Sequence, residues 1–260
     1  MNIFSRIGRK FSTLPERLRR ERVLSKLPDQ HQESLVRIGT SRGGWIVPET
    51  ALIAGATAVC VGAGEDISFD IELNKRSMRV FTVDPTPRAA RHVRQVLDGA
   101  ASGESVPINN SHVEHYDFSG FDPSRLTFLE VGLSDTNSVL RFWAPKDPAH
   151  VSHSIVNLQH TGEFFESQCI RLQDLCSANG IDEIEILKID VEGAEYAVLK
   201  DLTAGQLLPR VVCVEFDEGP NLQDKSSLQR ISDTVQDMKQ AGYRLLKTEH
   251  WNFMFCLRKD

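Results

Sequence analysis

The chain has 260 residues, of which 40% are hydrophobic and 25% are charged, and its formal net charge is −6 at pH 7. This composition is typical of a globular protein, and the negative charge argues against a general nucleic-acid binder, which needs a basic surface to neutralise phosphates. Because no window holds about 18 consecutive apolar residues, we expect no membrane-spanning helix and a cytoplasmic location. The five cysteines are scattered and form no C-x-x-C pair, which predicts free thiols in a reducing compartment.

The first residues of the chain are strongly basic and carry apolar residues at roughly helical spacing. Eight arginines and lysines between positions 6 and 26 face only two glutamates. We therefore expect a basic helical appendage over residues 1–44 and one α/β domain over residues 45–260. This helix would pack on the domain or pair two subunits as a homodimer; docking on an anionic surface is the alternative.

From residue 51 onward, apolar runs alternate with segments of helical periodicity. The apolar runs have the length of buried strands and cover residues 56–64, 78–87, 126–135, 184–190 and 210–218. The helical segments cover residues 67–76, 87–99, 195–202 and 226–242. Gly99 and Gly242 are expected to follow the ends of two of these helices.

Three further segments complete the expected architecture. Residues 138–145 read as an added β segment, residues 146–170 as mostly loop, and residues 243–259 as two strands joined by a short turn. Strands alternating with helices imply right-handed crossovers and a mostly parallel sheet with helices on both faces. With an antiparallel terminal strand, this predicts the seven-stranded, Rossmann-like arrangement of class I methyltransferases rather than two mononucleotide-binding halves.

A glycine turn follows the first strand of this pattern, at Gly62-Ala63-Gly64. Glycines allow a sharp turn and a close approach of the backbone to a ligand. The full G-x-G-x-x-G motif is not reached, because Ile67 stands where the third glycine would be. The turn therefore fits a nucleotide site, and equally a simple tight connection between strand and helix.

Acidic residues accompany the turn. Asp84 ends the second strand 20 residues after Gly64, where a carboxylate can accept hydrogen bonds from both ribose hydroxyls of an adenosine; the alternative is a cap for the helix that begins near Pro87. Glu65 and Asp66 could receive the amino group of S-adenosylmethionine and offset its positive charge. Alternatively, these two acids interact with the dipole of the following helix.

Several motifs together resemble the FkbM-type S-adenosylmethionine-dependent methyltransferases. In chain order they read VGAGEDISFD, VDPTPRA, VGLSD, RFWAP, HVSHSI and LKIDVEGAEYAVL, and the resemblance spans roughly residues 44 to 257. Generic class I methyltransferases usually carry an acidic residue two positions before the first glycine. This chain has Cys60 at that position, which agrees with the FkbM-like group. The resemblance implies O-methylation of a hydroxyl on a sugar, glycan or natural product, and it extends the cofactor site to Pro85 and Ser134.

Three carboxylates gather where the fourth strand meets its helix. Asp190 is expected at the carboxyl end of that strand, the edge at which open α/β sheets bind ligands. A carboxylate there can take the hydroxyl proton of an acceptor during in-line methyl transfer. Glu192 is the second catalytic candidate, although Glu192 and Glu195 could instead complement the helix N-terminus.

A divalent metal and a histidine base are the open alternatives at this edge. Asp190 and Asp217 could supply oxygen ligands to Mg²⁺, with Glu215 as a weaker third; a metal is possible but not favoured. His153 is the preferred histidine, because it lies in the HVSHSI motif of a long loop that could cover substrate. His250 could reach the rim of the pocket.

Other functions fit the sequence less well. Enzymes that methylate DNA bases or amide nitrogens commonly carry a proline-proline-aromatic tetrapeptide after the fourth strand, where this chain reads Asp190-Val191-Glu192-Gly193. A nicotinamide-dependent oxidoreductase is disfavoured by the missing third glycine and the lack of a Tyr-x-x-x-Lys pair. A non-catalytic cofactor-binding or scaffold protein with the same fold is the remaining alternative.

Overall fold

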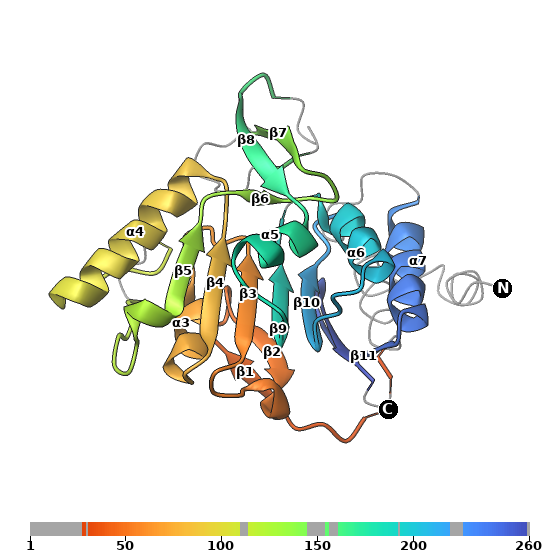
Figure 1. Ribbon diagram of the computed structural model, residues 1–260, viewed down its shortest axis with the longest axis horizontal. Helices are drawn as coiled ribbons and strands as arrows, with labels where there is room; N and C mark the ends of the chain where they lie inside the picture. Colours follow the sequence, from red (N-terminus) through yellow and green to blue (C-terminus); the bar gives the residue numbers. More distant parts are fainter. Residues whose placement is uncertain are drawn as a thin grey trace, which may run out of the picture.

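A seven-stranded sheet forms the centre of the molecule (Figure 1). The computed structural model describes residues 28–29, 31–109, 114–144, 154–155, 161–191, 193–218 and 226–258. The strand order is β11-β12-β10-β9-β3-β4-β5. In that order the strands span Tyr243–Glu249, Asn252–Leu257, Val211–Glu215, Ile186–Ile189, Thr57–Val61, Arg79–Val83 and Leu126–Leu129.

The sheet confirms the predicted Rossmann-like class I methyltransferase fold. Strands β10, β9, β3, β4 and β5 pair in parallel, and β12 runs antiparallel to both β10 and β11. The chain leaves β3 for β4 on one side, whereas β9 pairs with β3 on the other. The strand order therefore reverses between β3 and β9, which is the position where open α/β sheets bind their ligands.

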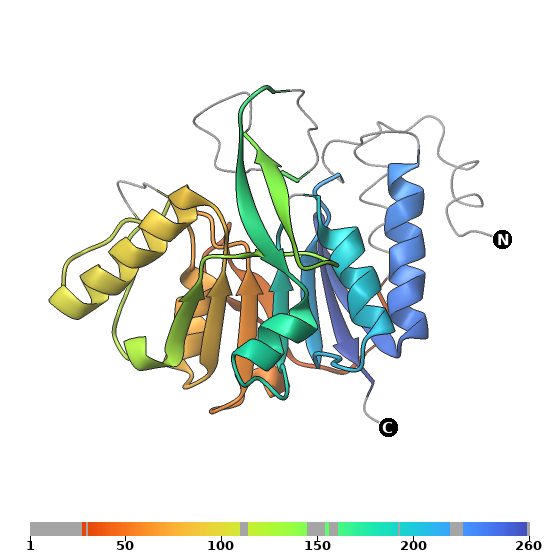
Figure 2. The ribbon, with the colours of Figure 1, turned by 45° about the horizontal axis from the view of Figure 1, so that its top comes forward.

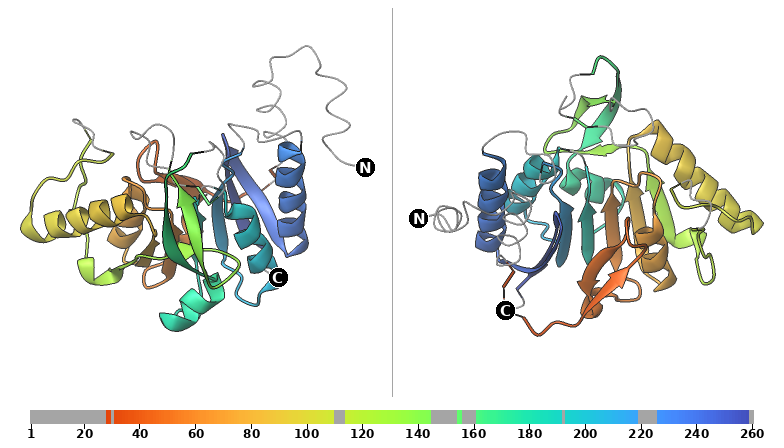
Figure 3. Two further views of the ribbon diagram at one scale, coloured as in Figure 1. Left: turned by 90° about the horizontal axis from the view of Figure 1, so that it is seen from above. Right: turned by 180° about the vertical axis from the view of Figure 1, so that it is seen from behind.

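Helices cover both faces of the sheet (Figures 1 and 3). One face carries α5 (Leu172–Ala178), α6 (Glu195–Ala204) and α7 (Ser227–Gln240). The other carries α3 (Ser68–Lys75) and α4 (Pro87–Ser102), together with the short strands β1 (Leu35–Ile38) and β2 (Trp45–Pro48). Two 3-10 turns, Glu49–Ala51 (η1) and Pro123–Arg125 (η2), lie between these elements.

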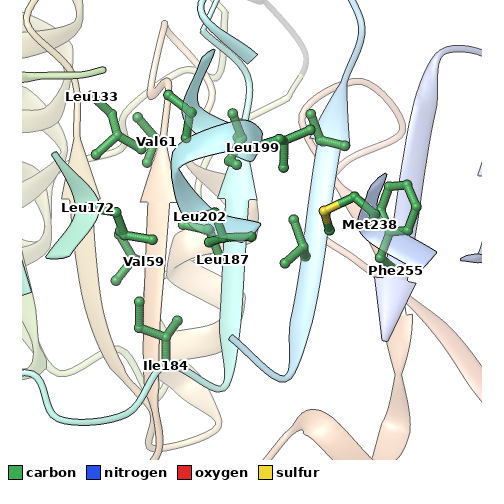
Figure 4. Packing of buried hydrophobic residues seen from close by; sticks show 14 of the residues in the cluster. Val59, Val61, Leu133, Leu172, Ile184, Leu187, Leu199, Leu202, Met238 and Phe255 are labelled. Carbon is green, nitrogen blue, oxygen red and sulfur yellow. The ribbon is translucent and has the colours of Figure 1, made fainter. Parts of the chain in front are cut away.

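The alternation of side chains along the central strands explains the two cores. In β3, Val59 and Val61 pack into the cluster beneath α5, α6 and α7, whereas Ala58 and Cys60 pack into the cluster beneath α3 and α4. Successive residues of a strand point to opposite faces, so a strand that is buried on both sides reads as a continuous apolar run. Figure 4 shows Leu187 of β9 in the first cluster, close to Leu202 of α6.

A small three-stranded sheet rises beyond the carboxyl edge of the main sheet (Figure 2). It consists of β6 (Gly132–Leu133), β7 (Ser138–Trp143) and β8 (Phe164–Ile170). The added β segment is confirmed as β7. The expectation that residues 146–170 are mostly loop is wrong for β8, which pairs with the whole of β7. Exposed residues alternate with partly buried ones along most of β8, so the sequence lacks the apolar run that marks the central strands.

Two predicted boundaries also shift. The helix expected to end before Gly99 continues to Ser102, and Gly99 lies inside it, where a Cβ atom would be 2.3 Å from Val106 Cγ2. Gly103, with a φ of 77°, takes the left-handed cap position instead. The strand expected over residues 126–135 divides into β5 in the main sheet and β6 in the small sheet.

The N-terminal part of the described chain is a hairpin that packs on α3. Strands β1 and β2 pair antiparallel, so the predicted domain boundary at residue 44 falls within this hairpin. The backbone N–H of Thr40 donates to Ser68 Oγ at 2.9 Å. Residues 1–27, where the amphipathic helix is predicted, lie outside the described residues, and the appendage and its dimer contact stay predictions.

Two composition-based expectations can be compared with the structure. All five cysteines are buried and free, which confirms the predicted thiols. Within the described ranges, the helices are too short or too polar to cross a membrane.

We predict that Leu187→Ala lowers the free energy of unfolding by about 2–5 kcal/mol, because it leaves a cavity beneath α6 in the fully buried centre of the sheet. Urea unfolding followed by circular dichroism measures this change. Val139→Ala, at a position on β7 that is 59% exposed, should change the value by less than about 0.5 kcal/mol. Equal losses in the two variants would contradict the assignment of Leu187 to the core.

Candidate active site

A cavity of about 450 Å³ opens at the carboxyl ends of β3, β4, β9 and β10. Gly62, Asp84 and Asp190, which come from three separate strands, all line it. The remaining predicted cofactor residues on its wall are Ala63, Gly64, Glu65, Asp66 and Pro85. The topology thus brings the glycine turn and the two strand-end aspartates to one place, as the sheet order predicts.

Gly62 is required by both its backbone conformation and its surroundings. Its φ is 87°, and a Cβ atom would lie 1.8 Å from the carbonyl oxygen of Asp190. The N–H of Gly62 donates to Val83 O at 2.9 Å, and the N–H of Asp190 donates to Val61 O at 3.1 Å. The close approach of the three strand ends therefore depends on the absence of a side chain at position 62.

Asp84 binds the glycine turn from the neighbouring strand. Its Oδ2 accepts the N–H groups of Ala63 at 2.8 Å and Gly64 at 3.1 Å. Its Oδ1 accepts the N–H and the hydroxyl of Thr86, both at 2.7 Å. The cap of α4 is Thr86, whose hydroxyl accepts from Ala89 N. Asp84 itself, only 5% exposed, therefore joins the glycine turn to Thr86, the residue that caps α4, and does not cap the helix directly.

Glu65 and Asp66 hold neighbouring segments against the turn. Glu65 makes a two-pronged ion pair with Arg88 of α4, with both N···O distances at 2.8 Å. Asp66 accepts from the Thr40 hydroxyl at 2.7 Å and from Ser68 N at 2.9 Å. Asn109 Nδ2 also donates to Asp66, at 3.3 Å. The two acids thereby fix the orientation of α4 and of the hairpin turn after β1.

The hairpin turn adds wall residues that the sequence analysis missed. Arg42 and Gly43 of this turn line the cavity, and so does Asn109, which follows α4. Gly43 lies directly over Asp66, since a Cβ atom there would be 2.4 Å from Asp66 Cγ. No local signal marks these residues, because they are far in sequence from the glycine turn and reach it only through packing.

Lys188 is a further important residue that the sequence analysis missed. It lies within β9, is buried, and its ammonium donates to the carbonyl oxygen of Gly62. The same Nζ lies 3.3 Å from Asp190 Oδ2. Burial alone would lower the pKa of Lys188, but the carboxylates of Asp190 and Asp70 outweigh it and raise the pKa above its usual value. A lysine inside an otherwise apolar strand was the available signal, because such a charge needs buried partners.

A row of polar and thiol side chains extends from Lys188 across the sheet. Thr82, Cys60, Lys188 and Cys213 are register partners on adjacent strands. Asp70 of α3 packs on this row and accepts the Thr82 hydroxyl at 2.5 Å. Burial raises the pKa of Asp70 from 3.8 to about 6. The glycine turn therefore rests on a buried polar layer rather than on apolar side chains alone.

The other predicted site residues divide into three groups. Asp217 and Glu215 line the cavity from the end of β10. Ser134 is buried and donates to Asp135, and the described wall of the cavity does not include it. Two predicted catalytic residues, Glu192 and His153, lie outside the described residues.

Two further expectations concern histidine and metal. His250 sits in the turn between β11 and β12 with a φ of 52°, and it is not among the described residues that line the cavity. No group of three or more His, Cys, Asp or Glu side chains is placed to hold a metal ion within the part of the chain that the structure describes.

Comparison with known proteins gives one family match. A family model described as the methyltransferase FkbM domain matches residues 55–245. A search of curated proteins found no match.

Among solved structures, the chain is similar to a fibrillarin pre-rRNA processing protein of Methanococcus jannaschii, with 8% identity, a TM-score of 0.41, and coverage of 90% of this chain and 86% of that one. It is also similar to the magnesium protoporphyrin IX methyltransferase of Synechocystis, with 10% identity, a TM-score of 0.38, and coverage of 81% and 77%.

We predict that Asp70 makes the protein less stable as the pH rises. Its pKa is about 6 in the folded chain and 3.8 in the unfolded reference, so the folded state binds the extra proton between these values. The contribution of Asp70 to the free energy of unfolding should therefore fall by about 3 kcal/mol as the pH rises from about 3 to about 7, with most of the loss between about pH 4 and pH 6. Asp70→Asn should remove this loss, and urea unfolding across that range measures it.

Asp237→Asn, a change at an exposed position on α7, serves as the control and should follow the parent protein at every pH. If the curve of Asp70→Asn also runs parallel to that of the parent protein, the raised pKa of Asp70 is wrong.

Proposed function

The chain belongs to the FkbM methyltransferase family and is an S-adenosylmethionine-dependent methyltransferase, and from this premise we propose that it methylates a hydroxyl of a sugar, glycan or natural product. The observation that carries the proposal is the meeting of Gly62, Asp84 and Asp190 on one cavity wall. Bound S-adenosylmethionine supplies an electrophilic methyl group on a sulfonium. The roles of the residues below follow from that chemistry.

The volume and the charge of the cavity fit S-adenosylmethionine. Its volume of about 450 Å³ lies within the range of about 300–1,000 Å³ that is usual for small-molecule sites. Six carboxylate residues line it, against two basic residues, Arg42 and Lys188. An acidic wall favours a ligand that carries a positive sulfonium and an amino group. At Gly62, where a side chain would collide with Asp190, the backbone is also free to approach the ligand.

Asp84 is the proposed partner of the ribose. Its two oxygens accept four protein donors, which is about the number that a carboxylate can take. A ribose hydroxyl would therefore replace one of these donors. The Thr86 hydroxyl is the one that can rotate away, because the other three are backbone N–H groups of the turn and the helix start. Glu65 and Asp66 are proposed to face the amino group of the cofactor.

Asp190 is the proposed base. Its side chain is 34% exposed at the cavity, while Lys188 holds one of its oxygens from below. The other oxygen can accept the proton of an acceptor hydroxyl as the new C–O bond forms. Lys188 orients Asp190 and does not itself reach the acceptor in this proposal. Glu192 and His153 stay predictions as further groups on the acceptor side.

The apolar part of the wall supports an acceptor with a ring. Phe142 lines the cavity from β7, and Phe165 of β8 stacks on it with a centroid distance of 5.1 Å and an interplanar angle of 12°. Leu133 and Ile155 extend this surface. Aromatic walls with a few polar groups are typical of sites that bind rings by one face, as sugars and many natural products can be bound.

We predict that Asp84→Ala weakens the binding of S-adenosylhomocysteine by at least about tenfold, because the change removes the ribose acceptor and releases the turn. Isothermal titration calorimetry measures this affinity. Asp98→Ala, at an exposed position on α4, is the matched control and should bind like the parent protein. Undiminished binding by Asp84→Ala would rule out the assigned role.

We predict that Asp190→Asn keeps its affinity for S-adenosylhomocysteine and loses turnover by about 10²–10⁴-fold, since an amide cannot take the proton. Turnover is measured as transfer of label from S-adenosylmethionine into an extract-derived acceptor. Repeating the assay with EDTA separates a direct base from a metal ligand, because only the second would make the parent protein lose activity. Full turnover by Asp190→Asn would contradict both roles of Asp190, the direct base and the metal ligand.

The labelled product also tests the acceptor. A methyl ether withstands mild alkaline hydrolysis, whereas a methyl ester loses its label as methanol. Label that resists alkali and follows a hydroxylated ring compound supports the proposal; label released by alkali or found on protein or nucleic acid contradicts it.

A further inference from the structure

Arg42 is an exposed residue of the turn between β1 and β2, and it lines the candidate active-site cavity. Its backbone is held in place, because the hydroxyl oxygen of Thr40 accepts the N–H groups of Arg42 at 3.3 Å and of Gly43 at 2.9 Å. No acceptor among the described residues meets its guanidinium group. The turn therefore presents an accessible cation to the cavity, with its side-chain donors open to a ligand.

The other cations near the glycine turn are already paired. Lys188, the second basic residue on the described wall of the cavity, is buried and lies 3.3 Å from Asp190 Oδ2. Arg88 makes its two-pronged ion pair with Glu65. Among these three cations, Arg42 is the one that is left for an anionic ligand.

The turn is anchored directly on Asp66. The Thr40 hydroxyl donates to Asp66 Oδ2 at 2.7 Å, and a Cβ atom on Gly43 would lie 2.4 Å from Asp66 Cγ. Arg42 is the chain neighbour of Gly43, so its side chain starts beside the carboxylate that is proposed to face the amino group of the cofactor. In an amino acid the amino group and the carboxylate share one carbon atom. A ligand amino group at Asp66 therefore brings its carboxylate close to this turn.

The charge of the cavity makes a cation necessary for such a ligand. Six carboxylate residues line the described wall, and like charges repel one another strongly at short distance in a partly desolvated site. A ligand carboxylate is therefore disfavoured here unless a positive group meets it. The planar fork of arginine matches both oxygens of a carboxylate and holds them in one orientation.

We propose that Arg42 binds the carboxylate of the methionine part of S-adenosylmethionine and so selects cofactors with an intact amino-acid end. The subsite rests on the cofactor placement proposed above, with Asp84 at the ribose and Glu65 and Asp66 at the amino group. The two charged groups of the amino acid are then matched separately, the ammonium by acids and the carboxylate by Arg42. A methionine chain that is held at both groups rotates less, which keeps the sulfonium aligned for in-line transfer.

The test compares two ligands by isothermal titration calorimetry of the full chain. One is S-adenosylhomocysteine, and the other is its decarboxylated analogue, which keeps the adenosine, the sulfur and the amino group. The parent protein should bind S-adenosylhomocysteine at least about tenfold more tightly, because the analogue lacks the charge-assisted hydrogen bonds. Arg42→Gln should lose about tenfold in affinity for S-adenosylhomocysteine. Its affinity for the analogue should stay the same or rise, because a charge that repels the ammonium is gone.

Two further variants separate the subsite from general effects of charge. Arg91→Gln, at an exposed position on α4 outside the described wall of the cavity, removes the same charge and should bind both ligands like the parent protein. Arg42→Lys should recover part of the preference for S-adenosylhomocysteine, because lysine keeps the charge without the fork.

If Arg42→Gln weakens both ligands by the same factor, or neither of them, the carboxylate subsite is wrong while the cofactor cavity stands. An Arg42→Gln variant that binds both ligands like the parent protein and has only a raised KM for the acceptor would place the arginine at the acceptor, and it would also overturn the subsite. Binding of neither ligand by the parent protein would overturn the subsite together with the proposed cofactor cavity.

Discussion

The buried ammonium of Lys188 is the interaction on which the active-site edge depends. It joins the carbonyl of Gly62 to the carboxylate of Asp190, and so ties the turn after β3 to the end of β9. A buried charge is tolerated only when it is paired and hydrogen-bonded, and both partners belong to the cavity. The same contact therefore satisfies the lysine and orients the proposed base.

The acidic residues around the turn are already engaged by protein donors. Asp84 holds the turn itself, Glu65 holds Arg88 of α4, and Asp66 holds Thr40 of the N-terminal hairpin. Side chains that are fixed in this way lose little freedom when a ligand arrives, which favours tight and oriented binding. The cavity is thus preorganised by contacts between segments that lie 20 or more residues apart.

Segments outside the parallel sheet supply the remaining walls. The turn after β1 brings Arg42 and Gly43 over Asp66, and β7 brings Phe142 from the small sheet beyond the carboxyl edge. The parallel sheet positions the cofactor residues, while these additions shape the entrance. Acceptor specificity in such a fold is expected to vary with the additions rather than with the sheet.

The sequence by itself determined the central sheet, the helices α3, α4, α6 and α7, and the meeting of Gly62, Asp84 and Asp190, because apolar periodicity is local and parallel strands end at a common edge. It did not predict α5. It did not indicate β8, the buried partners of Lys188 or the position of Arg42 at the cavity. It also predicted that α4 ends before Gly99, whereas the helix continues to Ser102. Only the tertiary structure decided these points. Each depends on packing between distant segments, and a contact of that kind leaves no repeating pattern in the chain that makes it.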